Sequence, residues 1–191
     1  MNTFFPDRLN SEPHALAFAG QSTPWPVALA DQSANPALDE ALHTHAAAAQ
    51  ALLYPVSAEL LATTGRPVDL FGFEPNPARL GAAAAASASV PGIALTQLGA
   101  LLDAAALGYN PAQAKPVVVL GHSQGVLAVH MVQAICEAGS IDAAAAKIDE
   151  ILAIATLIGV AGTRQARQLG LAARHGEATP MLSVKDITRA Q

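Results

Sequence analysis

A serine bracketed by two glycines constrains the fold of this chain more than any other feature. The sequence VVVLGHSQGVLAVHMVQA at residues 117–134 places Ser123 in a G-x-S-x-G motif between two apolar runs. The first run is rich in β-branched residues, as in a fully buried parallel strand, and the second, which stops at Gly139, is typical of a helix. The sequence therefore predicts a strand, a sharp turn and a helix in direct succession.

Such a turn requires small residues two positions before and two positions after the serine, where Gly121 and Gly125 stand. It would expose the Ser123 hydroxyl at the top of the sheet, with the backbone N–H of Gln124 opening the helix as a donor to developing negative charge. A G-x-S-x-G motif alone arises by chance in roughly one chain in twenty of this length. The main evidence for a catalytic serine is therefore the strand before the motif and the helix after it. We interpret Ser123 as a nucleophile rather than a structural turn residue.

The nearby histidines are poor candidates for a general base. His122 adjoins the serine in a tight turn, so its ring is expected to pack or hydrogen-bond beneath the turn. His130 lies two helical turns further on, ~10 Å along the axis, and is expected to serve packing or the surface. His14, His43 and His45 have no motif around them, and each is expected to be solvated or satisfied by a neighbour.

Strand and helix patterns alternate along the rest of the chain. Residues 81–90, GAAAAASASV, fit a linker and a helix equally well, and the proline-rich residues 66–79 predict an irregular connection. The remaining segments predict strands at 14–20, 115–122 and 179–186 and helices at 35–53, 91–107, 124–138 and 140–170. In the last helix, a break is predicted near Ser140, and Gly159 and Gly162 are expected to weaken the helix. This alternation predicts an α/β fold with a mostly parallel, helix-covered sheet, whose ligands bind at the carboxyl ends of the strands.

The overall composition suits one globular domain, since 52% of the 191 residues are hydrophobic and 13% are charged. A net charge of −5 without a basic run argues against nucleic acid or an anionic membrane as a partner. The single cysteine, Cys136, cannot form an internal disulfide, and residues 1–14 lack the apolar core of a signal peptide, so we expect a cytoplasmic protein. The uncharged residues 80–102 could span a bilayer by length, but their alanine and polar content predicts a soluble core helix.

Four segments resemble, in order, the acetyltransferase domain near the N-terminus of bacterial and fungal type I fatty acid synthases. GHSQG, preceded by SVPGIALTQLGALLDAAALGYNPAQAKPVVVL and followed by VLAVHMVQA, is similar to the family's nucleophile region. FAGQSTPW at 18–25 is similar to its F-x-G-Q-G segment, LIGVAGTRQAR at 157–167 to its segment on the helix after the nucleophile, and GEATPMLSV at 176–184 to the entry into its small subdomain. The resemblance covers residues 15–187.

The resemblance implies a fold, an activity and partners. It implies an N-terminal extension at 1–13, part of the α/β-hydrolase-like large subdomain of an acyltransferase at 14–178, and the start of a ferredoxin-like small subdomain at 179–191. Ser123 would take an acetyl group from coenzyme A and pass it through a serine ester to the phosphopantetheine arm of an acyl carrier protein. Acetyl-CoA is then a substrate, with no metal and no permanently bound cofactor, and other synthase domains are partners.

The resemblance also assigns the oxyanion donors. Gln21 matches the glutamine whose backbone N–H is the second donor, and Gln124 supplies the first. Without the resemblance, Gln21 would be a polar loop residue after a strand. The family often has glycine at the next position, where this chain has Ser22, so the sequence departs from the family pattern at this point of the loop.

Ile158 bears on the acyl group that such a site would accept. Related malonyl-transferring domains carry at this place an arginine that pairs with the free carboxylate of the malonyl group. An isoleucine cannot compensate a buried carboxylate, so the alignment implies an uncharged acetyl or other short acyl group. Without the alignment, Ile158 is a core residue of an apolar helix; Arg164 and Arg167 lie on the later, polar part of the same segment.

The family's general base histidine has no counterpart in this chain. His175 could complete a Ser-Asp-His order with Asp142 or Asp149, but it directly precedes the segment that approaches the small subdomain, so we reject it. The chain thus resembles a truncated domain, with weak or no turnover expected. Two other interpretations stay open: an α/β-hydrolase that acts as an esterase or thioesterase, and a non-catalytic piece of a multienzyme.

Overall fold

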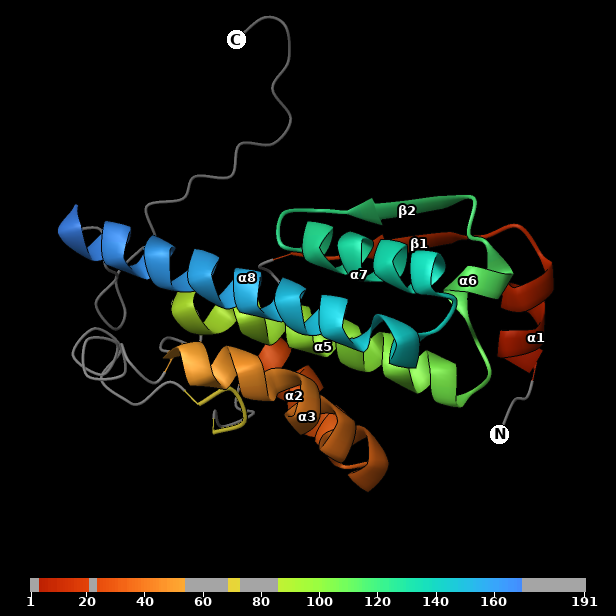
Figure 1. The fold of residues 1–191 in the computed structure, drawn as a ribbon, viewed down its shortest axis with the longest axis horizontal. Helices are drawn as coiled ribbons and strands as arrows, with labels where there is room; N and C mark the ends of the chain where they lie inside the picture. The colour runs from red at the N-terminus through yellow and green to blue at the C-terminus, as the bar shows by residue number, and fades with distance from the viewer. Residues whose placement is uncertain (1–3, 21–23, 54–68, 73–85, 170–191) are drawn as a thin grey trace, which may run out of the picture.

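The computed structural model describes residues 4–20, 24–53, 69–72 and 86–169 (Figure 1). Most of these residues are helical, and two parallel strands lie along one side, so the α/β expectation holds in its general form. The elements in chain order are α1 (Phe4–Ser11), β1 (Ala15–Phe18), α2 (Trp25–Ser33), α3 (Pro36–Leu53), α5 (Ala86–Ala106), α6 (Pro111–Ala114), β2 (Val118–Gly121), α7 (Gly125–Ala138) and α8 (Ile141–Gln168).

The two strands pair in parallel, with Ala15 opposite Val118 and Phe18 opposite Gly121. Both were expected from the sequence, but the expectation that the second is fully buried is wrong: Val118 is 40% and Leu120 57% exposed. Among the described elements, α7 is the helix that packs against both strands (Figure 1). The opposite face of this small sheet is therefore left open among the described residues, whereas full burial requires cover on both faces.

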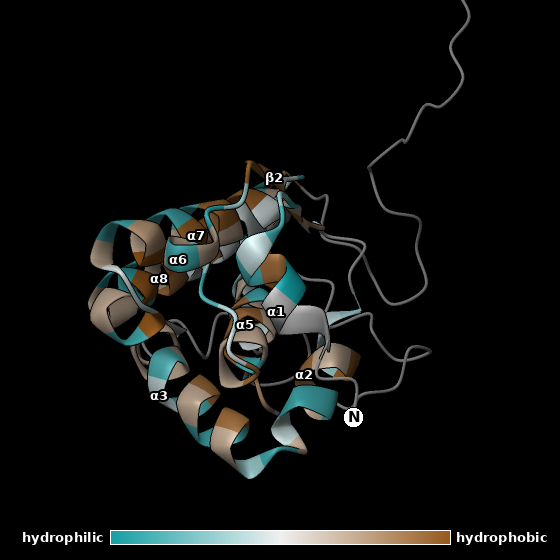
Figure 2. Ribbon diagram, turned by 90° about the vertical axis from the view of Figure 1, so that its right-hand side faces the viewer, coloured by the Kyte–Doolittle hydropathy of each residue, from teal (hydrophilic) through white to brown (hydrophobic). Residues whose placement is uncertain are grey.

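Helix α5 forms the centre of the fold, with α2, α3, α7 and α8 around it (Figure 2). Its described part starts at Ala86, so the helical interpretation of residues 81–90 is confirmed for 86–90, and the predicted start at Pro91 is wrong because the proline lies inside the helix. The backbone N–H of Ser87 donates to the Thr163 hydroxyl at 2.9 Å, which joins this part of α5 to α8. Although α5 is long and apolar enough to cross a membrane, 72% of the relevant window is buried inside the protein, as in the core helix of a soluble protein.

The helices after β2 follow the sequence pattern closely. Helix α7 ends at Gly139, which has a positive φ of 92°, a conformation in which glycine is favoured. Ser140 then accepts a hydrogen bond from the N–H of Ala143 at 3.2 Å and starts α8. Helix α8 runs without interruption through Gly159 and Gly162, so neither glycine breaks it.

Four helices, α3, α5, α7 and α8, supply most of the core. The larger side chains of at most 1% exposure that these four helices contribute to it are Leu42, Ile93, Leu95, Leu98, Met131, Val132, Ile135, Ile148 and Leu152. The helix expected at 35–53 is confirmed as α3, and residues 69–72 form a turn closed by the N–H of Gly72 and the carbonyl of Asp69 at 3.1 Å. The strand expected at 179–186 lies outside the described residues.

Candidate active site

Ser123 lies in the turn between β2 and α7, and its backbone φ is 55°. A side chain in this left-handed region costs roughly 1–2 kcal/mol, and such residues persist only where the surroundings impose the conformation. Strand, left-handed serine and helix follow one another within a few residues. The sequence prediction of a sharp strand–turn–helix is thus confirmed.

The two glycines of the motif are required by close backbone approach. A Cβ added to Gly121 would lie 2.5 Å from the carbonyl carbon and oxygen of Gly125 and 2.6 Å from the amide nitrogen of Val126. A Cβ added to Gly125 would overlap the carbonyl oxygen of Phe18 at the end of β1. Both positions exclude any larger residue, as expected from the spacing of the motif.

The chain after β1 wraps against this turn. The carbonyl of Phe18 accepts a hydrogen bond from the N–H of His122 at 3.0 Å. A Cβ on Gly20 would lie 2.6 Å from the His122 carbonyl oxygen and 2.7 Å from the Ser123 Cβ. Gln21, expected to supply the second oxyanion donor, follows directly but lies outside the described residues, as does Ser22.

The Ser123 hydroxyl is exposed and donates a hydrogen bond to the side-chain Oε1 of Gln124 at 2.9 Å. Gln124 is the N-cap residue of α7, so its backbone N–H lies at the positive end of the helix dipole. Within the described part of the chain, no histidine side chain hydrogen-bonds to the Ser123 hydroxyl. A neutral amide oxygen can orient this hydroxyl, but it cannot remove its proton.

Two of the described histidines are engaged with partners on other elements. His14 hydrogen-bonds through Nδ1 to the Glu12 carbonyl at 3.0 Å and through Nε2 to the Tyr109 hydroxyl at 2.8 Å. Burial raises the pKa of the Tyr109 hydroxyl. His45 is buried and lies 2.7 Å from an Asp149 carboxylate oxygen across the α3–α8 contact. Each is satisfied by a neighbour, as expected.

Asp149 therefore has His45 as its partner, whereas the sequence suggested His175. His175, with which it could have formed a triad, lies outside the described residues. Asp142, the other candidate acid, is exposed in the first turn of α8.

His122 and His130 are both exposed. For His130 this agrees with a surface position. For His122 the expected packing beneath the turn is wrong, because the residue is exposed.

Ile158 is 53% exposed on α8, beside Leu157 at 55%. Its interpretation as a core residue is therefore wrong, and the specificity role implied by the resemblance is left as a hypothesis. Arg164 is exposed one to two turns further along α8, and the Arg167 side chain lies outside the described part of the chain.

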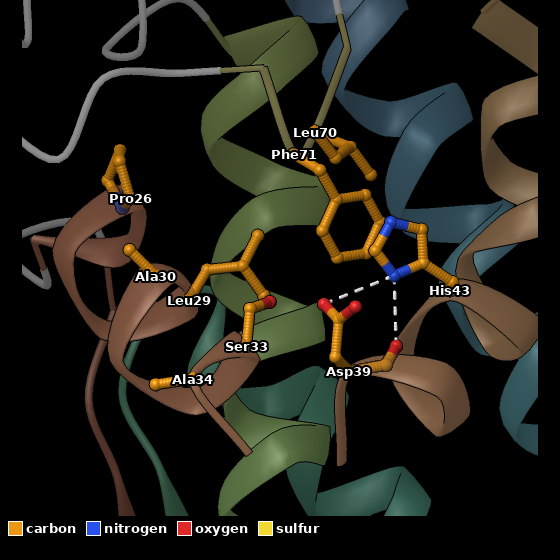
Figure 3. A pocket seen from close by; sticks show the side chains of 9 residues that line it. All are labelled: Pro26, Leu29, Ala30, Ser33, Ala34, Asp39, His43, Leu70 and Phe71. Atoms are coloured by element: carbon orange, nitrogen blue, oxygen red, sulfur yellow. Dashed lines mark hydrogen bonds and ion pairs between the residues drawn. The ribbon is translucent and has the colours of Figure 1, made fainter. Parts of the chain in front are cut away.

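A cavity of about 460 Å³ opens between α2, α3 and the turn at 69–72 (Figure 3). Inside it the His43 ring stacks on Phe71, with the ring centroids 3.6 Å apart, and its Nδ1 lies 3.3 Å from an Asp39 carboxylate oxygen. The other lining residues are Pro26, Leu29, Ala30, Ser33, Ala34 and Leu70. Ser123 and its neighbours are not among them, so this cavity is separate from the strand–turn–helix.

The described residues contain no cluster of three His, Cys, Asp or Glu side chains that could hold a metal ion. No family model, curated protein or solved structure matches the chain. The geometry around Ser123 is therefore the observation on which a functional interpretation rests.

One residue near this turn was missed in the sequence. Gln97 of α5 is 7% exposed, and its Nε2 donates a hydrogen bond to the carbonyl of Ala19, between β1 and Gly20. The available signal was a long polar side chain in the middle of a helix expected to be buried. Such a side chain needs a partner inside the protein.

Proposed function

We propose that this chain is part of an acetyltransferase of fatty acid synthesis in which Ser123 is the nucleophile. The observation that carries the proposal is the left-handed backbone of Ser123 between β2 and α7, where Gly121 and Gly125 allow backbone contacts that no side chain would permit. This geometry supports an α/β-hydrolase-like large subdomain, because a strained serine between strand and helix is the nucleophile position of that fold.

The proposed reaction is a two-step acyl transfer. The Ser123 oxygen attacks the thioester carbonyl of acetyl-CoA and loses its proton to a base, and the tetrahedral intermediate then expels the thiol of coenzyme A, which takes up a proton. The thiol of the acyl carrier protein's phosphopantetheine attacks the resulting serine ester in the reverse sequence. The backbone N–H groups of Gln124 and Gln21 are the proposed donors to the intermediate's oxyanion.

We also propose that Ile158 favours uncharged acyl groups. Its exposure on α8 supports this role, because an exposed side chain is accessible to a substrate, whereas a core residue is not. With isoleucine at this place, the free carboxylate of a malonyl group lacks the cation that would compensate its burial. A cytoplasmic location, the acyl carrier protein and other synthase domains as partners belong to the same proposal.

We assign the general base to none of the described residues, so we expect the chain to react slowly. The test is intact mass spectrometry after incubation with acetyl-CoA, with Ser123→Ala as the control. We expect slow addition of one acetyl group to Ser123 and none at this position in the variant. Equal acetylation of wild type and variant would contradict the proposal, and rapid stoichiometric acetylation would show that the chain contains its own base.

A parallel incubation with malonyl-CoA tests the specificity. Labelling at the acetyl-CoA rate would contradict the role of Ile158. The fate of the ester separates transfer from hydrolysis: release of acetyl to a pantetheine thiol faster than to water supports a transferase, and release to water alone supports an esterase or thioesterase.

A further inference from the structure

The side chain of Gln124 lies beside the Ser123 hydroxyl, in a space that exists because residue 20 is a glycine. Its Oε1 accepts a hydrogen bond from Ser123 Oγ at 2.9 Å. A Cβ added to Gly20 would lie 2.7 Å from the Cβ of Ser123 and 3.3 Å from Gln124 Oε1, and both distances are shorter than an ordinary van der Waals contact. The chain after β1 therefore leaves room for the hydroxyl and for the amide that accepts from it.

The backbone on both sides of this hydrogen bond has a defined conformation. Ser123 has the left-handed φ of 55°, and Gln124 has the helical values φ −61° and ψ −18° directly before α7. Gln124 is half-buried, whereas Ser123 is exposed. A serine side chain has three staggered rotamers, and contact with solvent does not select one of them. The hydrogen bond to the half-buried amide therefore favours a single rotamer of an otherwise exposed hydroxyl.

We propose that the Gln124 side chain is a positioning residue, which holds the Ser123 oxygen in the rotamer from which it attacks the acyl donor. The inference rests on the proposed function and adds a role for the side-chain amide, separate from that of the Gln124 backbone N–H. With its O–H directed at Oε1, the serine oxygen keeps its lone pairs for the thioester carbonyl carbon. Because an amide oxygen does not take up the proton, Gln124 orients the nucleophile and leaves proton transfer to a base.

Removal of the amide should slow the chemistry without weakening donor binding. Gln124→Met keeps the length of the side chain but has no strong hydrogen-bond acceptor. Ser123 should then distribute over its three staggered rotamers, so we expect acetylation at saturating acetyl-CoA to be about threefold slower. The acetyl-CoA concentration at half-maximal rate should stay unchanged, because the amide is not proposed to bind the donor.

Gln133→Met is the matched control. Gln133 lies on the same helix, α7, and its side chain also takes part in an exposed side-chain hydrogen bond, from Nε2 to Glu137 Oε1 at 2.8 Å. This bond involves no residue of the turn. Gln133→Met should therefore acetylate Ser123 at the wild-type rate.

Gln124→Glu adds a readout that a merely structural role would not move, because a carboxylate at this position can take the proton. As Ser123 Oγ bonds to the thioester carbonyl carbon, its proton would pass to the carboxylate, and the carboxylic acid would return it to the sulfur of the departing thiol. General base assistance is worth about 10²–10⁴-fold in enzyme sites, so for an exposed carboxylate we expect acetylation at least about tenfold faster than in wild type. The ratio of the two rates should rise with pH through the pKa of the introduced group, about 4.3 for an unperturbed glutamate.

The rotamer itself can be measured without any reaction. The couplings between the Hα and Hβ protons of Ser123, measured by NMR on the full chain with labelled serine, report its side-chain torsion. We expect one dominant rotamer in wild type and in Gln133→Met, and averaged couplings in Gln124→Met. This measurement examines the hold of Gln124 on Ser123 even if no acetylation occurs.

The outcomes separate the two proposals. Averaged couplings in wild type, a Gln124→Met rate equal to or above that of wild type, equal slowing of both methionine variants, or a Gln124→Glu ratio that does not change with pH would each overturn the role of Gln124. The proposed function stands in these cases if wild type is acetylated at Ser123. A dominant rotamer without acetylation above the Ser123→Ala background would overturn the proposed function, and with it the catalytic meaning of the rotamer. Selective slowing of Gln124→Met, with a pH-dependent gain in Gln124→Glu, supports both.

Discussion

Gly20 and Ser123 lie so close together that no side chain fits at the glycine: a Cβ on Gly20 would be 2.7 Å from the Cβ of Ser123. The two residues follow different strands of the sheet, one just after β1 and the other just after β2. Their contact brings the segment that follows β1 to the exposed serine. The candidate site is therefore assembled from two strand ends that are adjacent because the strands pair in parallel.

Gly20→Ala should disturb this contact. The new Cβ would meet the His122 carbonyl oxygen and the Ser123 Cβ, so one strand end must move, and we expect a loss of about 1–3 kcal/mol in the free energy of unfolding. Urea denaturation followed by circular dichroism measures this loss. Gly162→Ala is the control, since among the described residues its new Cβ would come no closer than 3.4 Å, to the Cβ of Ala86. Equal stability of the two variants would contradict the packing at Gly20.

At position 123, glycine should give a more stable protein than alanine, which is the reverse of the order at an ordinary helix position. Because φ is 55°, Ser123→Gly should be more stable than Ser123→Ala by about 1 kcal/mol. At the exposed helical residue Ala143, glycine should instead be less stable than alanine by about 1 kcal/mol. Thermal melts of wild type, Ser123→Gly, Ser123→Ala and Ala143→Gly show whether glycine or alanine is the more stable residue at each position. A Ser123→Gly variant less stable than Ser123→Ala would contradict the left-handed conformation.

The two glycines of α8 should respond oppositely to alanine. A Cβ on Gly159 would overlap the backbone carbonyl of Ala86 at the start of α5, so Gly159→Ala should destabilise the protein by about 1–3 kcal/mol. Within the described part of the chain, the new Cβ of Gly162→Ala meets only ordinary contact, so the variant should be more stable by up to about 1 kcal/mol through helix propensity. Chemical denaturation of both variants measures the difference. Stabilisation by both changes would show that α5 and α8 are further apart than described.

The pair formed by His45 and Asp149 should contribute more to stability than the neighbouring surface pair. Asp149→Ala leaves the buried His45 ring without its partner at 2.7 Å, with an expected cost of about 1–3 kcal/mol. Glu150→Ala removes an exposed ion pair with Lys147 and should cost less than about 1 kcal/mol. Denaturant midpoints of the two variants provide the measurement. An Asp149→Ala cost no larger than that of Glu150→Ala would contradict the buried pairing.

The strand–turn–helix around Ser123 was predictable because its determinants are local. The β-branched run, the spacing of Gly121 and Gly125, and the stop at Gly139 all lie within the segment that they shape. The helix at 35–53 was predictable for the same reason, since the Asn-Pro start and the helical spacing of its apolar residues lie within the segment itself.

Other features depend on partners far away along the chain. Pro91 resembles a helix start, but it lies inside α5, whose residues before the proline pack against α8 through the bond from Ser87 to Thr163. Ile158 resembles a core residue, yet α8 turns this face away from its neighbours. Hydrophobicity shows that a residue is apolar, but not which helix covers it.

Local sequence thus accounts for the type and order of the main elements and for the left-handed serine between its glycines. Packing between distant segments accounts for the contact of Gly20 with the turn, the bond from Gln97 to Ala19, and the sheet face that the described helices leave uncovered. The physical reason is that periodicity and turn composition act over a few residues. Burial and hydrogen-bond partners depend on which segments meet once the chain has folded.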